Sequence, residues 1–344
     1  MYNELCIDLG SSSVIISTPE RGIIERQSCV TLIDRYSGKV VAYGDEAVKK
    51  HAESPADYIL DRPLRDGIAK NIDRVQALIS MFLSSVCGNE FVPDRVLFSV
   101  PCDIEPMEES ALVEVAAQCG IRDAYVMYSP LAALLASEMD VVNSYISVDV
   151  GASKTNIMII CHGNIVYSES VDCGGNKFDS AIAEYVFDKH GVRISAFTAE
   201  NIKKKIGTLW GDDSSNRTVD VKTRRPDGSF STIRISSEEM FVALEEPTAV
   251  LIEAVCTAIS NIPTQYVNDV FSHGILLCGG GALLGGLSKI IAGITGVDAY
   301  VFPNSSDAVA LGMSEALKVL PKKITQSIKN ISRFCLKSLG GYNI

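Results

Sequence analysis

The sequence has no C-x-x-C pair, although it contains 10 cysteines in 344 residues. Many of these cysteines stand in apolar runs, such as Cys6 in ELCIDLG and Cys278 in GILLCGG. Structural zinc sites and disulfide scaffolds need paired or regularly spaced cysteines, so this pattern argues against both. It favours small buried side chains in a reducing compartment.

Long apolar segments are also missing. No run reaches the roughly 20 apolar residues that span a bilayer, and MYNELCIDLG has neither the basic nor the apolar region of a signal peptide. The net charge of -11, with a pI near 4.9, argues against a nucleic-acid partner. We therefore expect a cytoplasmic protein.

Acidic residues are absent after Glu315, where the chain becomes basic. Ile324, Ile328, Ile331 and Cys335 recur there at helical spacing, with Phe334 nearby and lysines and arginines between them. This pattern predicts a basic amphipathic helix over 319–344 on an anionic membrane surface. A partner-binding helix is the alternative.

Strand and helix patterns alternate along the rest of the chain. We expect strands at 95–100, 124–128 and 274–278, and a two-stranded excursion over 219–235 with its turn at 225–228. Helical spacing predicts helices at 74–86, 105–118, 130–137, 177–190, 199–206, 237–244 and 250–260. The alternation indicates an α/β fold, and the length favours two domains.

One pattern occurs twice. LCIDLGSSSVIIS (5–17) and YISVDVGASKTNIMII (145–160) both run from an apolar strand through D-x-G and small polar residues into a second strand. Another strand follows each copy, at Gly22 and at Gly163. The repetition predicts two halves of similar design.

The two D-x-G turns suit a polyphosphate. Glycine permits a tight turn and a close approach of the backbone to phosphate, and a carboxylate at a strand end can hold hydrated Mg²⁺. One such turn alone would be a plain hairpin, but two can clamp a ligand from both sides. The expected contacts are Asp8 and Asp149 for the metal, and Ser11, Ser12, Ser13, Gly151, Ala152, Ser153 and Lys154 for the nucleotide.

Two further segments fit the same ligand. Gly279, Gly280, Gly281 and Ala282 follow a buried strand and can lie flat against a base or ribose, although a flexible loop has the same composition. Glu200 and Lys203 share a helix face, where they could bind ribose hydroxyls or form a solvated ion pair.

In order and content these segments resemble the MreB family of bacterial actin homologues, within the actin, sugar-kinase and chaperone ATPase superfamily. The resemblance covers residues 5 to about 318. It is carried by Asp8–Ser13, RPLRDGI (62–68), Asp149–Thr155, TAENIKKKIG (198–207), Ser236–Glu239 with Glu245–Pro247, and GILLCGGGALLGGL (274–287).

The resemblance implies an actin-like fold with two α/β domains around a central cleft for ATP and Mg²⁺. Domain I would cover 1–140 with an insertion at about 29–70, and domain II 141–318 with an insertion at about 176–250. The last helix, about 305–318, would pack back on domain I. The chain would form filaments with copies of itself at the inner face of the cytoplasmic membrane, with cell-envelope morphogenesis proteins as partners.

Several positions depart from the family. Tyr128 and Ser129 replace two glutamates near the attacking water, which leaves Ser129 and Thr155 as candidate catalytic residues and predicts slow hydrolysis. Ala152 and Ser153 replace glycines, and Lys154 adds a cation that could reach phosphate or solvent.

Phe91 and Val92 occupy the loop that forms a membrane-insertion tip in the family, although such side chains can also tuck into the core. Three other functions share the superfold. A sugar or acid kinase would need a carboxylate base that we cannot assign, and a chaperone would need a peptide-binding domain. A division actin of the FtsA type should lack the 198–207 and 236–247 stretches, which are present.

Overall fold

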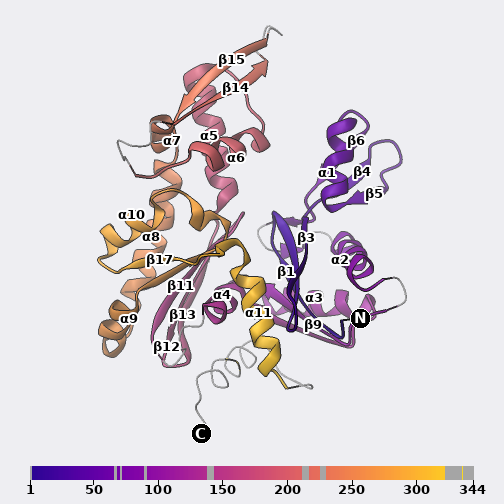
Figure 1. The fold of residues 1–344 in the computed structure, drawn as a ribbon, viewed down its shortest axis with the longest axis vertical. Helices are drawn as coiled ribbons and strands as arrows, with labels where there is room; N and C mark the ends of the chain where they lie inside the picture. The colour runs from indigo at the N-terminus through magenta and orange to yellow at the C-terminus, as the bar shows by residue number, and fades with distance from the viewer. Residues whose placement is uncertain are drawn as a thin grey trace.

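The computed structural model describes residues 2–65, 68–69, 72–88, 91–137, 143–210, 217–224, 230–321 and 335. Two α/β halves stand side by side, each built on a five-stranded sheet (Figure 1). The α/β fold predicted from the alternating patterns is therefore confirmed.

The first sheet has the strand order β10-β9-β1-β2-β3. Its strand β1 pairs antiparallel with β2 and parallel with β9. Ile7 and Leu9 point into the apolar core, so Asp8 between them points to the opposite face. The strands are β1 (Glu4–Leu9), β2 (Ser13–Thr18), β3 (Gly22–Ser28), β9 (Arg95–Val100) and β10 (Asp123–Tyr128).

The second sheet, of order β13-β12-β11-β16-β17, repeats this pairing. Its strand β11 runs antiparallel to β12 and parallel to β16, as β1 does to β2 and β9. The strands are β11 (Tyr145–Val150), β12 (Thr155–Cys161), β13 (Asn164–Val171), β16 (Ile275–Cys278) and β17 (Ala299–Val301). Asp8 and Asp149 therefore hold equivalent positions near the ends of the two central strands.

Each sheet carries an added unit. In the first half, α1 (Gly44–Glu53) packs on the small sheet of β4 (Thr31–Asp34), β5 (Val40–Tyr43) and β6 (Tyr58–Asp61), and the short pair β7 (Leu64–Arg65) and β8 (Ile68–Ala69) follows. In the second half, α5 (Gly175–His190), α6 (Ala196–Ile206) and α7 (Ser237–Ala243) accompany the hairpin of β14 (Thr218–Arg224) and β15 (Phe230–Ser236). The turn expected at 225–228 lies outside the described residues.

The other helices cover the sheets. They are α2 (Ile72–Cys87) and α3 (Pro106–Gln118) in the first half, and α8 (Glu245–Ser260), α9 (Val267–His273) and α10 (Leu287–Thr295) in the second. Among the residues that the structure describes, three short 3-10 turns are η2 (Thr264–Tyr266), η3 (Gly280–Leu283) and η4 (Ser305–Asp307). In the described part of the chain, none of the helices has the length and apolar character needed to cross a membrane.

Two helices start three or more residues earlier than the sequence prediction. Helix α6 begins at Ala196, because the Ser195 hydroxyl caps it by accepting the Thr198 amide hydrogen. Helix α8 begins at Glu245 and continues through Pro247. A proline is tolerated there because amide groups in the first helical turn have no partner inside the helix.

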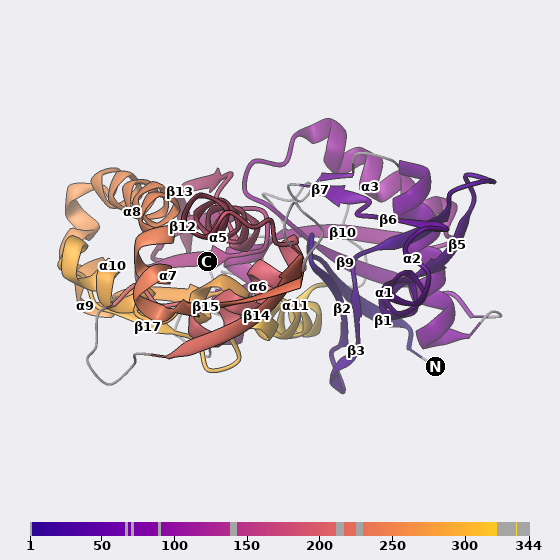
Figure 2. The same ribbon diagram turned by 90° about the horizontal axis from the view of Figure 1, so that it is seen from above.

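Helix α11 (Ala308–Val319) lies where the halves meet (Figure 2) and packs against α4 (Ser129–Ala136). The contact is close: a Cβ at Gly312 would lie 1.6 Å from the Ala132 carbonyl oxygen. The Ser17 hydroxyl donates to the Ala310 carbonyl at 2.7 Å. The buried Arg95 guanidinium donates to the Leu317 carbonyl at 3.2 Å, so α11 is fixed on the first sheet.

Candidate nucleotide-binding cleft

The first D-x-G turn joins β1 to β2. A Cβ at Gly10 would lie 2.8 Å from the Ser13 carbonyl oxygen, so this tight turn requires glycine. The Cys29 amide donates to the Ser12 carbonyl at 2.9 Å. The Arg62 guanidinium, just after β6, donates to the Ser11 carbonyl at 3.0 Å. The turn is thus held by bonds to its own backbone.

The second turn joins β11 to β12 and is tied to the start of α5. The Gly151 amide donates to the Lys154 carbonyl at 2.9 Å and closes the turn. The Gly151 and Ala152 carbonyls accept from the amides of Gly175 and Asn176 at 2.9 and 2.7 Å. The N-terminus of α5, which favours negative charge, therefore lies beside this turn.

The triple glycine packs against the second turn. Gly279 has a φ of +79°, and a Cβ there would lie 2.4 Å from the Val150 carbonyl oxygen. A Cβ at Gly281 would lie 2.4 Å from Val150 Cγ1. Gly280 has more room, since the nearest atom to its added Cβ is 3.7 Å away. Two of the three glycines are therefore required by packing between protein segments.

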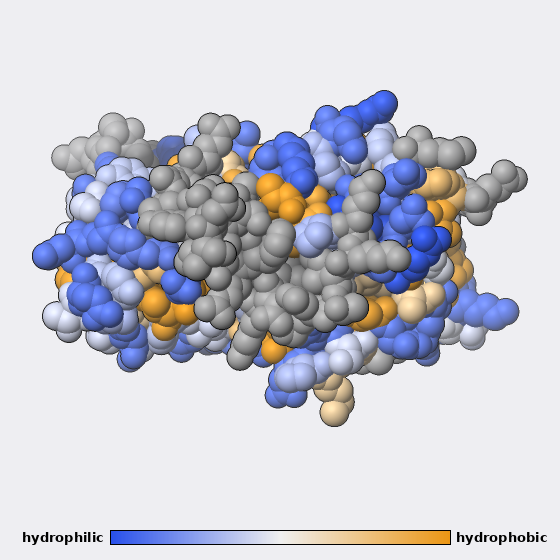
Figure 3. Space-filling model, turned by 90° about the horizontal axis from the view of Figure 1, so that it is seen from below, coloured by the Kyte–Doolittle hydropathy of each residue, from blue (hydrophilic) through white to orange (hydrophobic). Residues whose placement is uncertain are grey.

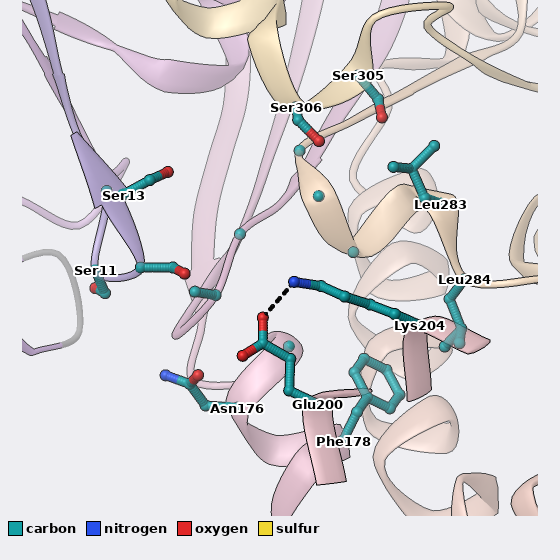
Figure 4. Close-up of a pocket in the computed structure, with 18 of the residues that line it drawn as sticks. Ser11, Ser13, Asn176, Phe178, Glu200, Lys204, Leu283, Leu284, Ser305 and Ser306 are labelled. Atoms are coloured by element: carbon teal, nitrogen blue, oxygen red, sulfur yellow. Dashed lines mark ion pairs between the residues drawn. The ribbon is translucent and has the colours of Figure 1, made fainter. Parts of the chain in front are cut away.

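These turns surround one cavity of about 680 Å³, within the range usual for small-molecule sites. Most of the predicted residues line it: Asp8, Ser11, Ser12, Ser13, Asp149, Gly151, Ala152, Glu200, Lys203, Gly279, Gly280 and Gly281. Figure 4 shows Ser11 and Ser13 across the cavity from Leu283 and Leu284. Ser129, Ser153, Lys154, Thr155 and Ala282 are not among the lining residues.

The two carboxylates occupy a buried, like-charged setting. Burial raises the pKa of Asp8 to about 6, the Ser99 hydroxyl opposes the rise by donating to Asp8 Oδ1 at 2.5 Å, and the Asp149 charge adds to it. Burial also raises the pKa of Asp149. Two carboxylates that repel each other in a cleft would be stabilised by a divalent cation, and their oxygens suit Mg²⁺. The described residues hold no group of three or more ligands, so water and phosphate oxygens would complete the metal's coordination.

Helix α6 does not use its two predicted residues together. Glu200 pairs with Lys204 at 2.7 Å, as the dashed line in Figure 4 marks. Lys203 instead contacts α5, with 2.8 Å to the Asp179 carboxylate and 2.7 Å to the Gly175 carbonyl. Glu200 and Lys204 thus reach into the cavity, while Lys203 joins two helices at its edge.

Ser129 and Thr155 are both bonded to protein groups. The Ser129 hydroxyl accepts from the Asn156 amide at 3.1 Å, and Thr155 donates to the Cys173 carbonyl at 2.5 Å. Asn156 also donates to Asp149 at 3.5 Å and accepts from the Cys102 amide at 3.2 Å. Asn156 is therefore the central polar group between Ser129 and Asp149.

Lys154 forms an ion pair with Asp103 and lies 3.5 Å from the Asp172 carboxylate. Burial acts to lower the pKa of Lys154, but the two carboxylates outweigh it and hold this pKa above its ordinary value. The Lys154 side chain is only 9% exposed. The sequence alone allowed Lys154 to reach either phosphate or solvent. In the structure its ammonium instead pairs with the carboxylate of Asp103, which follows β9.

The residues predicted to contact the membrane differ in how exposed they are. The Val92 residue is 43% exposed, whereas Phe91 is half-buried. Ile324, Ile328, Ile331 and Phe334 lie outside the described residues. Cys335, the last member of the predicted apolar stripe, is buried in the core of the first half. Burial raises its thiol pKa to about 12.

Sequence reasoning missed several cavity residues. Lys204 could have been found, because it stands four residues after Glu200 on a predicted helix. Asn156 does not line the cavity but bonds Ser129 and Asp149, and it carries no motif signal in the sequence. Other polar lining residues reach the cavity only through the tertiary fold, among them Arg26, Asn176, Arg217, Ser305 and Ser306.

Two α/β halves that repeat one strand pairing, with a D-x-G turn from each facing a shared cavity, define an actin-like protein. The family model described as MreB/Mbl protein matches residues 2–325. The chain is 31% identical over 327 residues to the cell shape-determining protein Mbl of Bacillus subtilis, covering 93% of this chain and 98% of that protein. It is also 31% identical to the cell shape-determining protein MreB of Escherichia coli, covering 92% and 94%. The chain belongs to the MreB/Mbl family and is thus a cytoskeletal actin-like protein.

Solved structures agree. MreB5 of Spiroplasma citri bound to ADP superimposes with a TM-score of 0.86 at 25% identity, covering 92% of this chain and 96% of that one. The MamK double helical filament superimposes with a TM-score of 0.79 at 17% identity, covering 93% and 100%, and shows the shared fold.

Proposed function

We propose that the cleft binds ATP and ADP with Mg²⁺, and that the chain assembles with copies of itself into filaments in the cytoplasm. The observation that carries the proposal is the pair of equivalent D-x-G turns, which bring Asp8 and Asp149 to one cavity. The solved structures of the related MreB5 of Spiroplasma citri bound to ADP and to AMPPNP support the choice of ligand.

In this proposal, different residues of the cleft contact the phosphates, the ribose and the base of the nucleotide. Backbone amides and hydroxyls of residues 11–13, with Gly151 and Ala152, face the phosphates. Glu200 and Lys204 contact the ribose, and the exposed edge at Gly280 faces the base. Asp8 and Asp149 hold Mg²⁺ through water, and a bound Mg²⁺ would neutralise charge on the phosphates.

Hydrolysis would be slow. A water-orienting carboxylate is missing at Ser129, and the Asn156 amide already donates to the Ser129 hydroxyl. Phosphoryl transfer depends on positioning and charge, so the loss affects turnover more than binding.

The proposed domain division is the one that the resemblance to the MreB family implies. We propose domains at 1–140 and 141–318, with insertions at about 29–70 and 176–250. The β5-β4-β6 sheet with α1, and the β14-β15 hairpin, support the positions of these insertions. The contacts of α11 with β1, β2 and α4 support a last helix that returns to domain I.

A peripheral membrane position is also proposed, with the tail over 319–344 and the Phe91–Val92 loop as anchors and cell-envelope proteins as partners. The basic composition after Glu315 supports it. On the face seen from below, the coloured apolar atoms form separate areas among polar ones (Figure 3).

Calorimetry tests the ligand. Wild-type protein is titrated with ADP, with and without Mg²⁺, beside Asp149→Ala. We expect binding that Mg²⁺ strengthens in the wild type and a much smaller Mg²⁺ effect in the variant. The absence of any nucleotide binding by the wild-type protein would refute the proposal. Electron microscopy with ATP then tests filament formation independently of the membrane.

A further inference from the structure

Three residues form a row across the first sheet. Asp8 is paired directly with Ile15 on β2, and Ile15 with Arg26 on β3. Directly paired residues point to the same face of a sheet, and two strand spacings place the backbones of Asp8 and Arg26 about 10 Å apart. All three line the cavity. Arg26 therefore faces the nucleotide cleft on the same side as Asp8.

Arg26 has a partner on the far side of this cleft. Its guanidinium forms an ion pair with the Asp307 carboxylate on η4, which follows the second sheet. The side chains are 44% and 30% exposed, so solvent reaches the pair. Such exposed pairs contribute little to stability, so replacing the carboxylate by another anion costs little.

Among the described residues, the other cations that line the cavity have partners on their own side of the cleft. Arg62 donates to Ser11 on the same side of the cleft. Lys203 and Lys204 bind Asp179 and Glu200, and Arg217 donates to the Lys205 carbonyl, all within the second half. Among these, Arg26 is the one whose partner lies across the cleft.

We propose that Arg26 is a phosphate-binding residue of this cleft, and that Asp307 competes with the phosphates for its guanidinium. The inference rests on the proposed nucleotide binding and assigns it a specific cation. A guanidinium binds phosphate oxygens in a two-pronged geometry that no amide or hydroxyl provides. Lys154, the cation of the second turn, is held by Asp103 and does not line the cavity.

The charges in the cleft agree with this assignment. The pKa of Asp8, which burial raises to about 6, is lowered in part by the Arg26 charge, so the two groups interact. A nucleotide phosphate brings further negative charge beside Asp8 and Asp149, and a neighbouring cation offsets it. When Arg26 moves to phosphate, its tie to η4 is released, so phosphate binding changes a contact between the halves.

The test measures ADP and adenosine affinities, by competition with a fluorescent nucleotide in the presence of Mg²⁺, in the full-length protein. The variants are Arg26→Gln and Asp307→Asn. Arg21→Gln is the matched control, since Arg21 is exposed on the same hairpin, contacts Tyr2 and does not line the cavity. Thermal unfolding reports whether each variant is folded.

We expect Arg26→Gln to weaken ADP binding about tenfold and adenosine binding not at all. Asp307→Asn should bind ADP at least as tightly as wild type, because it removes the competitor. Equal weakening of ADP binding by both variants, or an Arg26→Gln affinity equal to that of Arg21→Gln, would overturn the inference. If Arg26→Gln does not fold, weaker ADP binding by Asp307→Asn overturns it alone. If the wild-type protein binds no ADP, the proposed function fails first.

Discussion

The Lys154 ammonium and the Asp103 carboxylate join the second D-x-G turn to the loop after β9 in the first half. The neighbouring backbone strengthens this contact, since the Asp103 amide donates to the Ser170 hydroxyl at 3.2 Å. A cation that sequence alone allows to reach phosphate thus links the two halves at the base of the cleft.

We expect Lys154→Gln to lower the free energy of unfolding by about 1 kcal/mol, because it removes the cation that pairs with Asp103, a carboxylate whose side chain is 39% exposed. ADP affinity should change little. Lys177→Gln is the control, since Lys177 is exposed nearby on α5. Urea unfolding and ADP titration separate the two roles: lost affinity with unchanged stability would mean that Lys154 contacts phosphate.

Asp8 should make stability depend on pH. Its pKa is about 6 in the folded protein against an ordinary value of 3.8, so the folded state binds the proton more tightly. Stability from this group is greatest below about pH 4 and falls as the pH rises to about 6. Asp8→Asn should therefore be more stable than wild type at pH 7, by the order of 1–3 kcal/mol.

The difference in unfolding free energy between wild type and Asp8→Asn, measured at pH 4.5 and pH 7, checks the sign. It should be larger at pH 7. The same variant should lose most Mg²⁺-dependent ADP binding, because the amide carries no charge for the metal. A variant that is less stable than wild type at pH 7 would show that the Asp8 carboxylate stabilises the fold.

Gly281 and Gly280 make a matched pair in one turn. An added Cβ at Gly281 would overlap Val150 Cγ1 at 2.4 Å, whereas at Gly280 the nearest atom is 3.7 Å away. Gly281→Ala should cost about 1–3 kcal/mol of stability through overpacking, and Gly280→Ala well under half of that. Thermal unfolding of both variants decides whether packing or ligand contact explains the glycine at 281.

Restoring a carboxylate beside the cleft tests turnover. Ser129→Glu should raise the phosphate release rate from ATP several-fold, because it supplies a group that orients water. Ser129→Gln is the control, with similar size and no charge. Equal rates in both variants would attribute the change to space rather than to the carboxylate. A new side chain must displace the Asn156 amide, which donates to Ser129 in the wild type.

Local pattern was enough to predict most strands of the two five-stranded sheets and both D-x-G turns, because apolar alternation and glycine at fixed offsets are properties of adjacent residues. It did not predict the strands β4, β5, β6 and β17. The helix predicted over 74–86 likewise buries Val75, Leu78, Ile79 and Phe82 in the first core. Local pattern could not predict contacts between segments that lie far apart in the sequence. Asp307 follows Arg26 by 281 residues, and Asp103 precedes Lys154 by 51, so no spacing rule could link them.

The contacts of Arg95 determine where the chain can be cut to test the membrane role of the tail. Arg95 donates to the carbonyls of Leu320 and Pro321 at 3.2 and 2.8 Å, so a truncation should keep residues through Pro321. Cys335 is buried in the first core, and its removal should cost some stability. Cys335→Ser in the full-length chain isolates that cost without removing a single positive charge.

We expect the protein ending at Pro321 to lose binding to anionic liposomes while it keeps ADP affinity. Each lysine or arginine near such a surface contributes about 1 kcal/mol, and filaments would multiply a weak anchor. Val92→Ser tests the loop separately, since Val92 is 43% exposed. Co-sedimentation at low and high salt compares the three variants with wild type. If the truncated protein sediments as well as wild type while Val92→Ser does not, the loop is the anchor. The tail, with Cys335 in the core, would then serve to complete the fold.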